Sequence, residues 1–180
     1  TPLQGPIDME SNSLTYCPTC GAALVDTQIE GRTRRYCQQC ENPIYRNPKP
    51  CVGVLVVDEG DLLLVKRTQP PGVGTWSVPA GFLEYDESPA LGAVRELEEE
   101  TGVTASAEEL ELFDTAFITA GERANVLVII YRVKRSATKG EPEPGSDAGD
   151  ARFWEMESFG SENEQVEPGY EEIFRRARNL

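Results

Sequence analysis

The chain has 180 residues, 39% of them hydrophobic, and a formal net charge of −14. This length accommodates one well-cored domain and a small appendage. No apolar run approaches the ~20 residues that a membrane span needs. The first residues also lack the basic start and apolar run of a signal peptide. We therefore expect a cytoplasmic protein with no membrane partner.

The acidic character of the chain limits its partners. It contains 31 acidic residues, 17 basic residues and only four lysines. Such a field repels polyanions, which argues against nucleic acid as a general partner. Acid excess together with lysine scarcity favours adaptation to high salt, as in a halophile, where screening relieves self-repulsion. The alternative is an ordinary acidic protein.

Histidine is absent from the sequence. This excludes Ser-His-Asp triads, Cys-His nucleophile pairs and His-ligated zinc hydrolases. Any hydrolytic chemistry must therefore use carboxylates, a metal ion, or lysine, tyrosine and cysteine side chains.

The first segment, residues 14–42, holds four of the five cysteines. Cys17, Cys20, Cys37 and Cys40 have the spacing C-x2-C-x16-C-x2-C. Two such pairs supply the four thiolates of a tetrahedral zinc site with no open position, so we predict a structural zinc ribbon. Two disulfides or free thiols are the alternatives, and a cytosolic location disfavours disulfides. Cys51 lies outside this pattern and is expected to be a buried strand residue.

The remaining elements follow in chain order. Residues 43–50 contain three prolines and read as a linker. A domain over residues 51–180 follows. Its pattern predicts strands at 51–57, 61–66, 112–119, 125–134 and 152–156, and helices beginning at Ser88–Pro89 and at 170. Gly102 suits the end of the first helix, and residues 139–150 read as a polar loop. Mixed strands with two helices indicate an α/β sandwich.

The first helix carries a cluster of carboxylates. Glu96, Glu99 and Glu100 share one face at roughly 100° per residue, while Ala90, Val94 and Leu97 fall on the other side and are expected in the core. A solvated acidic face is one interpretation. The other is a site for magnesium or manganese, which prefer hard oxygen ligands. Arg95, one turn before Glu99, can steady it.

The segment from Gly81 to Val103 resembles the Nudix box, G-x5-E-x7-R-E-U-x-E-E-x-G-U, where U is a bulky aliphatic residue. Nine specified positions match: Gly81, Glu87, Arg95, Glu96, Leu97, Glu99, Glu100, Gly102 and Val103. A cysteine ribbon followed by the residues YRNPKP (45–50) resembles the zinc-ribbon branch of that family. This branch includes NADH pyrophosphatases and FAD or ADP-ribose pyrophosphatases. The resemblance implies an α/β/α sandwich with a mixed sheet behind the ribbon.

The resemblance also implies roles for individual residues. Glu96 and Glu100 correspond to metal ligands, Glu99 to a further ligand or base, and the Ala80 carbonyl to a backbone ligand. Glu87 and Arg95 correspond to a pair that braces the loop against the helix. Another acid is expected from the loop before the last strand, with Asp147 as the best match and Asp150 as the alternative.

The implied activity is hydrolysis of a pyrophosphate bond in a nucleoside diphosphate derivative such as ADP-ribose, FAD or a related dinucleotide, with Mg²⁺ or Mn²⁺. The Ser-Gln-Pro-Trp-Pro-Phe-Pro stretch of NADH pyrophosphatases is missing after the box, so NADH is expected to be a poorer substrate. Two alternatives stay open: a nucleoside triphosphate housecleaning enzyme, and a non-catalytic ligand sensor. Arg32, Arg34 and Arg35 leave open a ribbon that contacts nucleic acid or protein, and a ribbon can equally mediate a homodimer.

Overall fold

The computed structural model describes residues 14–70, 72–119, 125–145, 148–155 and 164–177. The chain divides into two compact units, Thr1–Pro48 with Ala120–Asn125, and Lys49–Thr119 with Val126–Leu180. We call them the ribbon unit and the sheet unit and describe each by itself.

Three short antiparallel strands form the ribbon unit: β1 (Val25–Ile29), β2 (Arg32–Cys37) and β3 (Asn42–Ile44). Glu30 and Gly31 have positive φ between β1 and β2, as tight hairpins require. The core is small, with Cys17, Leu24 and Cys37 as its buried members. Domains with so little core commonly depend on a metal or disulfides.

A seven-stranded mixed sheet forms the centre of the sheet unit. Its order is β12-β5-β4-β10-β9, with β6 paired to β5 and β7 to β4. Strands β4 and β10 are parallel, and the other pairs are antiparallel. The bounds are β4 Lys49–Asp58, β5 Asp61–Arg67, β6 Trp76–Ser77, β7 Ala80–Phe82, β9 Glu111–Ile118, β10 Val126–Lys134 and β12 Ala148–Trp154. The sheet unit also contains four short elements outside this sheet: β8 (Thr104–Ala105), η2 (Ala107–Glu109), η3 (Arg135–Ala137) and β11 (Thr138–Lys139).

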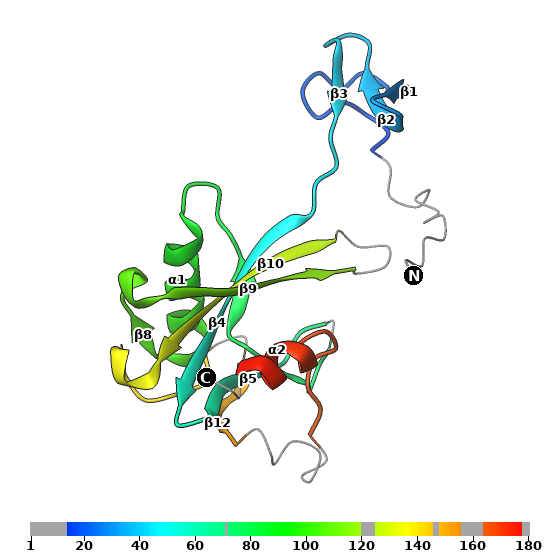
Figure 1. Cartoon of the computed structure of the whole chain (residues 1–180). Coiled ribbons are helices and arrows are strands. Elements are labelled where there is room, and N and C mark those ends of the chain that lie inside the picture. Colours follow the sequence, from blue (N-terminus) through cyan, green and yellow to red (C-terminus); the bar gives the residue numbers. More distant parts are fainter. Residues whose placement is uncertain (1–13, 71, 120–124, 146–147, 156–163, 178–180) are drawn as a thin grey trace. The chain divides into compact units, whose positions relative to one another are not determined.

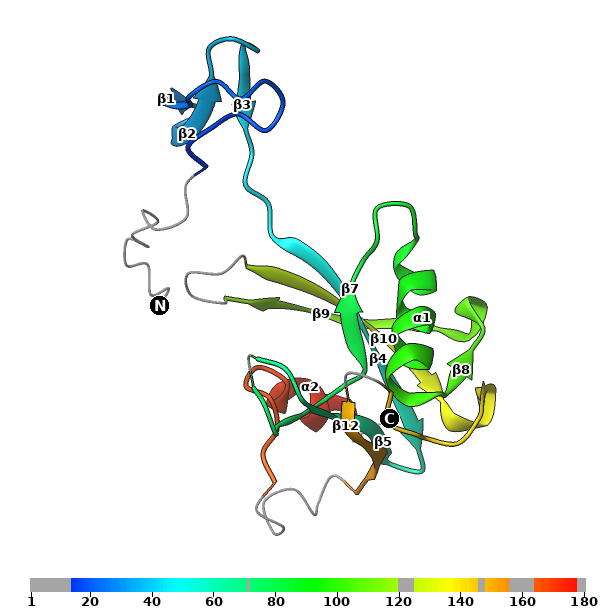
Figure 2. The same ribbon diagram turned by 180° about the vertical axis from the view of Figure 1, so that it is seen from behind.

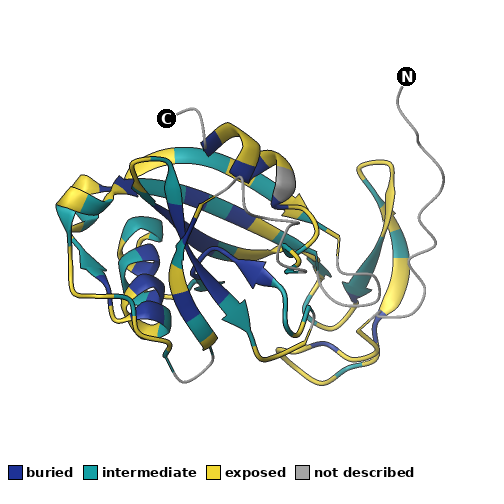
Figure 3. Cartoon of the chain, turned by 90° about the horizontal axis from the view of Figure 1, so that it is seen from below, coloured by how far each residue is buried: buried dark blue, intermediate teal, exposed yellow. Residues whose placement is uncertain are grey.

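Two helices, α1 (Pro89–Thr101) and α2 (Glu171–Ala177), cover opposite faces of the sheet (Figures 1 and 2). Side chains alternate along β4 between two hydrophobic clusters, as the pleat dictates. The α1 cluster holds Val52, Val54, Val56, Ala93 and Leu97. The α2 cluster holds Leu55, Leu62, Leu64, Ile173 and Phe174. Buried residues, dark blue in Figure 3, lie mainly along the central strands. The predicted α/β/α sandwich with a mixed sheet is therefore confirmed.

Several element boundaries differ from those predicted. Strand β3 includes residues 43 and 44, and β4 begins at Lys49, so strand structure occupies both ends of the expected linker. The last strand lies at Ala148–Trp154 instead of 152–156, because its residues pair with β5 from Ala148 onward. Tertiary pairing thus outweighs the low strand propensity of Gly149 and Asp150. Neither helix of the described chain is long and apolar enough to cross a membrane.

Candidate functional site

Helix α1 supplies the carboxylates of the site. It begins at Pro89, whose missing N–H suits the first helical position. Ser88 has the extended backbone of an N-cap, although its side chain makes no capping hydrogen bond. The helix ends where Gly102 adopts φ 68° and donates its N–H to the Glu98 carbonyl at 2.8 Å. Both predicted ends of this helix are confirmed.

Glu96 is the most buried acid of the helix, with a relative exposure of 9%. Its carboxylate lies against Gly81 of β7, in space that a β-carbon at position 81 would fill. Burial raises the pKa of Glu96, and the neighbouring charges of Glu99 and Glu87 act in the same direction, while Arg95 opposes them. A buried carboxylate of this kind is stabilised by a cation.

Arg95 of α1 binds three carboxylates, one in the loop before the helix and two on the helix itself. It donates to both Glu87 oxygens at 2.6 and 3.1 Å, to Glu96 at 2.6 Å and to Glu99 at 3.1 Å. A further bond reaches the Phe82 carbonyl at 3.1 Å. Hydrogen bonds from Arg95 and from the Glu84 backbone lower the pKa of Glu87. The Glu87–Arg95 pair therefore fixes the loop of residues 82–87 against the helix, because the two-pronged contact specifies geometry.

Glu100 and Glu99 occupy different surroundings. The half-buried Glu100 accepts a hydrogen bond from the Ala80 backbone N–H at 2.9 Å, which places its carboxylate beside β7. Glu99 is exposed, with 59% of its side chain accessible. Glu96 and Glu99 share one donor, Nη1 of Arg95, so their carboxylates are close neighbours.

The core face of α1 departs from prediction. Leu97 is buried and Val94 packs against the α1 cluster, as expected. Ala90, however, is only half-buried, and Ala93 takes the core position. Glu96 is buried as well, which contradicts the interpretation of this face as fully solvated. The reason is β7, which lies against this side of the helix and uses Gly81 to admit the carboxylate.

Comparison with known proteins identifies the family. The model of the NUDIX domain matches residues 47–177. The chain belongs to the Nudix hydrolase family. A solved NUDIX hydrolase from Nitrosomonas europaea superposes with a TM-score of 0.71 and 24% identity over 92% of each chain, which supports the Nudix fold.

Two curated relatives show the range of named activities. The NAD-capped RNA hydrolase NudC of Photobacterium profundum is 36% identical over 89 residues, which is 49% of this chain and 32% of the relative. An ADP-ribose pyrophosphatase of Methanocaldococcus jannaschii is 29% identical over 116 residues, 64% of this chain and 67% of the relative. The match to NudC thus spans about a third of that protein.

Of the two candidates for the acid before the last Nudix strand, the structure describes only Asp150. Asp147 lies outside the described residues. Asp150 belongs to β12, where its Oδ1 accepts the Ala151 N–H at 2.8 Å and its Oδ2 lies 3.5 Å from Nε of Arg152. Asp150 is therefore paired within its own strand.

The donor set on α1 fits a hard divalent cation. Glu96, Glu99 and Glu100 offer carboxylate oxygens, the Ala80 backbone N–H binds Glu100, and Gly81 leaves room for Glu96. Such ligands suit magnesium or manganese better than softer metals. Divalent-metal dependence is typical of Nudix enzymes.

The four ribbon cysteines form a separate metal-type site. Their sulfur atoms all lie within 4.8 Å of one another, and those of Cys20 and Cys37 are 3.5 Å apart. Tetrahedral zinc with bonds of about 2.3 Å separates its sulfurs by roughly 3.8 Å. None of the four cysteines is in a disulfide. The backbone amides of Cys20 and Thr19 lower the pKa of Cys17 to about 6, whereas hydrogen bonds with Cys20 and Cys37 raise the pKa of Cys40 to about 12. The set therefore fits a structural zinc.

Sequence reasoning missed two sets of contacts in the sheet unit. Cys51 of β4 lies near the box acids: burial, then Glu96 and Glu100, raise its pKa to about 12. The second is a clasp at the C-terminal segment, where Glu164 accepts bonds from Nζ of Lys66 and Nε1 of Trp76, both at 2.9 Å. Glu164 lies 98 positions from Lys66 and 88 from Trp76 in the sequence, so only the folded structure shows that they interact.

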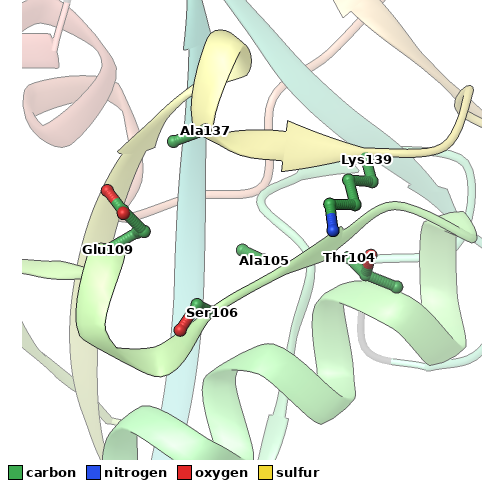
Figure 4. A pocket seen from close by; sticks show the side chains of 6 residues that line it. All are labelled: Thr104, Ala105, Ser106, Glu109, Ala137 and Lys139. Carbon is green, nitrogen blue, oxygen red and sulfur yellow. The ribbon is translucent and has the colours of Figure 1, made fainter.

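A pocket on another part of the sheet unit contains none of these residues (Figure 4). Its lining comes from β8, η2, η3 and β11, and consists of Thr104, Ala105, Ser106, Glu109, Ala137 and Lys139. It contains one carboxylate and one amine and none of the box acids.

Proposed function

We propose that this protein hydrolyses the P–O–P linkage of a nucleoside diphosphate joined to another moiety, with Mg²⁺ or Mn²⁺ held by Glu96, Glu100 and the Ala80 carbonyl and with Glu99 as a further ligand or as the base. The observation that carries the proposal is the buried Glu96 carboxylate seated on Gly81 and joined through Arg95 to Glu99. An acidic helix face serving only solubility would leave its carboxylates in water.

The residues of the site have distinct tasks in this proposal. A bound divalent cation supplies phosphate charge neutralisation and a lowered pKa of water. Arg95 and Glu87 hold the loop and helix in register. The exposed Glu99 is available to accept the proton of the attacking water, and Asp147 is the second candidate for that role. Glu96 and Glu100 keep their oxygens oriented through Arg95 and the Ala80 amide.

The proposed substrates are ADP-ribose, FAD or a related dinucleotide, cleaved to AMP and the other half. The names of two relatives, an ADP-ribose pyrophosphatase and an NAD-capped RNA hydrolase, support this class. The substrate in each name contains adenosine linked through a pyrophosphate. We also propose one structural Zn²⁺ in the ribbon, on the strength of the sulfur cluster.

A substrate panel tests this proposal. ADP-ribose, FAD, NADH and nucleoside triphosphates are incubated with magnesium or manganese, and products are identified by mass spectrometry. We expect AMP from ADP-ribose or FAD and slower release from NADH. Cleavage of triphosphates alone, with release of pyrophosphate, would assign the protein to housecleaning. Tight binding of one nucleotide without turnover would assign it to ligand sensing.

A further inference from the structure

The ribbon unit differs sharply in charge from the rest of the chain. Residues 14–48 contain four arginines and three acids, which gives 4 − 3 = +1. Residues 49–180 contain 13 basic and 26 acidic residues, which gives 13 − 26 = −13. The overall charge of −14 therefore describes the sheet unit and not the ribbon.

Arginines are also used differently in the two units. Each of the seven described arginines of the sheet unit pairs with a carboxylate: Arg67, Arg95, Arg132, Arg135, Arg152, Arg175 and Arg176. In the ribbon, Arg35 alone does so, with Asp26 at 2.9 Å. Arg32, Arg34 and Arg46 have no carboxylate partner within the described ranges of the chain. The ribbon therefore offers three arginines whose charge no described carboxylate neutralises.

Two of these arginines lie on one face of the ribbon sheet. The register pairs Ile29 with Arg32, Thr27 with Arg34 and Val25 with Tyr36. Directly opposed residues share a face of the sheet. The opposite face carries Arg35 and Cys37 and lies over the cysteine core. We call the first the arginine face, and it contains no acidic residue.

Aromatic rings accompany the guanidinium groups. Arg34 stacks over the ring of Tyr45 with 4.8 Å between the guanidinium carbon and the ring centroid. Tyr45 itself is 54% exposed. The Arg34 Nε atom is buried without a hydrogen-bond partner among the described residues, so the group is held by stacking and not by an ion pair. Planar arginine and tyrosine surfaces are those on which unpaired bases stack.

We propose that the arginine face of the ribbon, with Tyr45 and Arg46 beside it, binds single-stranded nucleic acid. The arginines contact phosphates and the exposed tyrosine stacks on a base. This combination of cationic groups and aromatic planes is typical of surfaces that track single strands without reading sequence. The proposal is independent of the hydrolytic site, because no ribbon residue is needed for the box chemistry.

Anisotropy of a 5′-fluorescein-labelled single-stranded RNA of mixed sequence, titrated with the full chain in magnesium-free buffer, tests the proposal. Omitting magnesium separates binding from cleavage. Neutralising two or three phosphates gives a slope of log affinity against log salt of about −1.4 to −2.1. We expect Arg32→Gln/Arg34→Gln to weaken binding about tenfold at low salt and to make the slope shallower by about 1.4.

A matched control removes the same charge elsewhere. Arg132→Gln/Arg175→Gln changes two carboxylate-paired arginines of the sheet unit and is expected to alter affinity by less than about twofold. Tyr45→Leu should weaken binding without changing the salt slope. All variants should keep their zinc and their turnover of ADP-ribose, which separates this proposal from the proposed function.

Three outcomes overturn the proposal. The first is that the unaltered chain binds no RNA at low salt. The second is that the face variant and its control lose affinity equally. The third is that light scattering shows a dimer which Arg32→Gln/Arg34→Gln converts to a monomer, since the face would then serve a second copy of this acidic chain.

Discussion

The carboxylate of Glu96 lies directly against the backbone of Gly81, in the space that any larger residue would need for its β-carbon. One position of β7 thus determines where a buried acid of α1 can sit. Since a glycine at this position is part of the Nudix box, the contact gives a steric reason for that element of the motif.

Gly81→Ala is expected to displace the Glu96 carboxylate. Half-maximal activity should require about ten times more Mg²⁺ or Mn²⁺, because disturbing the support of a metal ligand typically costs 10- to 100-fold in affinity. Rate as a function of metal concentration measures this, with thermal melting as a check of folding. A metal dependence equal to that of the unaltered protein would contradict the assignment.

Replacing the carboxylates tests their charge with little change of shape. Glu96→Gln and Glu100→Gln should each lower kcat by at least about 100-fold at saturating magnesium. Glu98→Gln removes the same charge from an exposed position of the same helix and should remain active. Near-normal rates in the first two variants would mean that these residues do not hold the metal.

The local sequence was sufficient to predict α1, because Pro89 and Gly102 mark its ends. It could not predict the burial of Glu96, since that depends on β7 approaching from a segment outside the helix. The ribbon strands were missed because they are only three to six residues long and β2 carries charged residues. The predicted boundaries of β12 were wrong because its extent is set by pairing with β5 and not by local strand propensity.

The C-terminal clasp should make stability depend on pH. Hydrogen bonds from Lys66 and then Trp76 lower the pKa of Glu164. A lowered folded pKa adds stability above the unfolded value of about 4.3, and this stability is lost as pH falls through the folded pKa. Glu164→Gln should therefore lower the Tm at pH 7, and the difference from the unaltered chain should shrink below about pH 4.

Glu59→Gln, in the exposed β4–β5 turn, is the control for that measurement. It removes one carboxylate without removing an ion pair seen among the described residues. A Tm difference for Glu164→Gln that stays constant between pH 7 and about pH 3 would show that the charged clasp contributes nothing.

Zinc content tests the ribbon. Elemental analysis after dialysis should find about one zinc per chain, and Cys37→Ser should lose it because a three-thiolate site binds less tightly. Cys51→Ser changes the cysteine outside the cluster and should retain zinc. Retention by both variants, or an absence of zinc from the unaltered protein, would exclude a four-cysteine site.

Hydrolysis of ADP-ribose in oxygen-18 water tests the central claim most directly. With magnesium we expect AMP and ribose 5-phosphate in equal amounts, and one oxygen-18 atom in only one of the two products. That label identifies the phosphorus attacked by water, as metal-assisted hydrolysis of a pyrophosphate requires. Absence of labelled product from ADP-ribose and from FAD, although the protein is folded and metal-loaded and binds them, would contradict the claim.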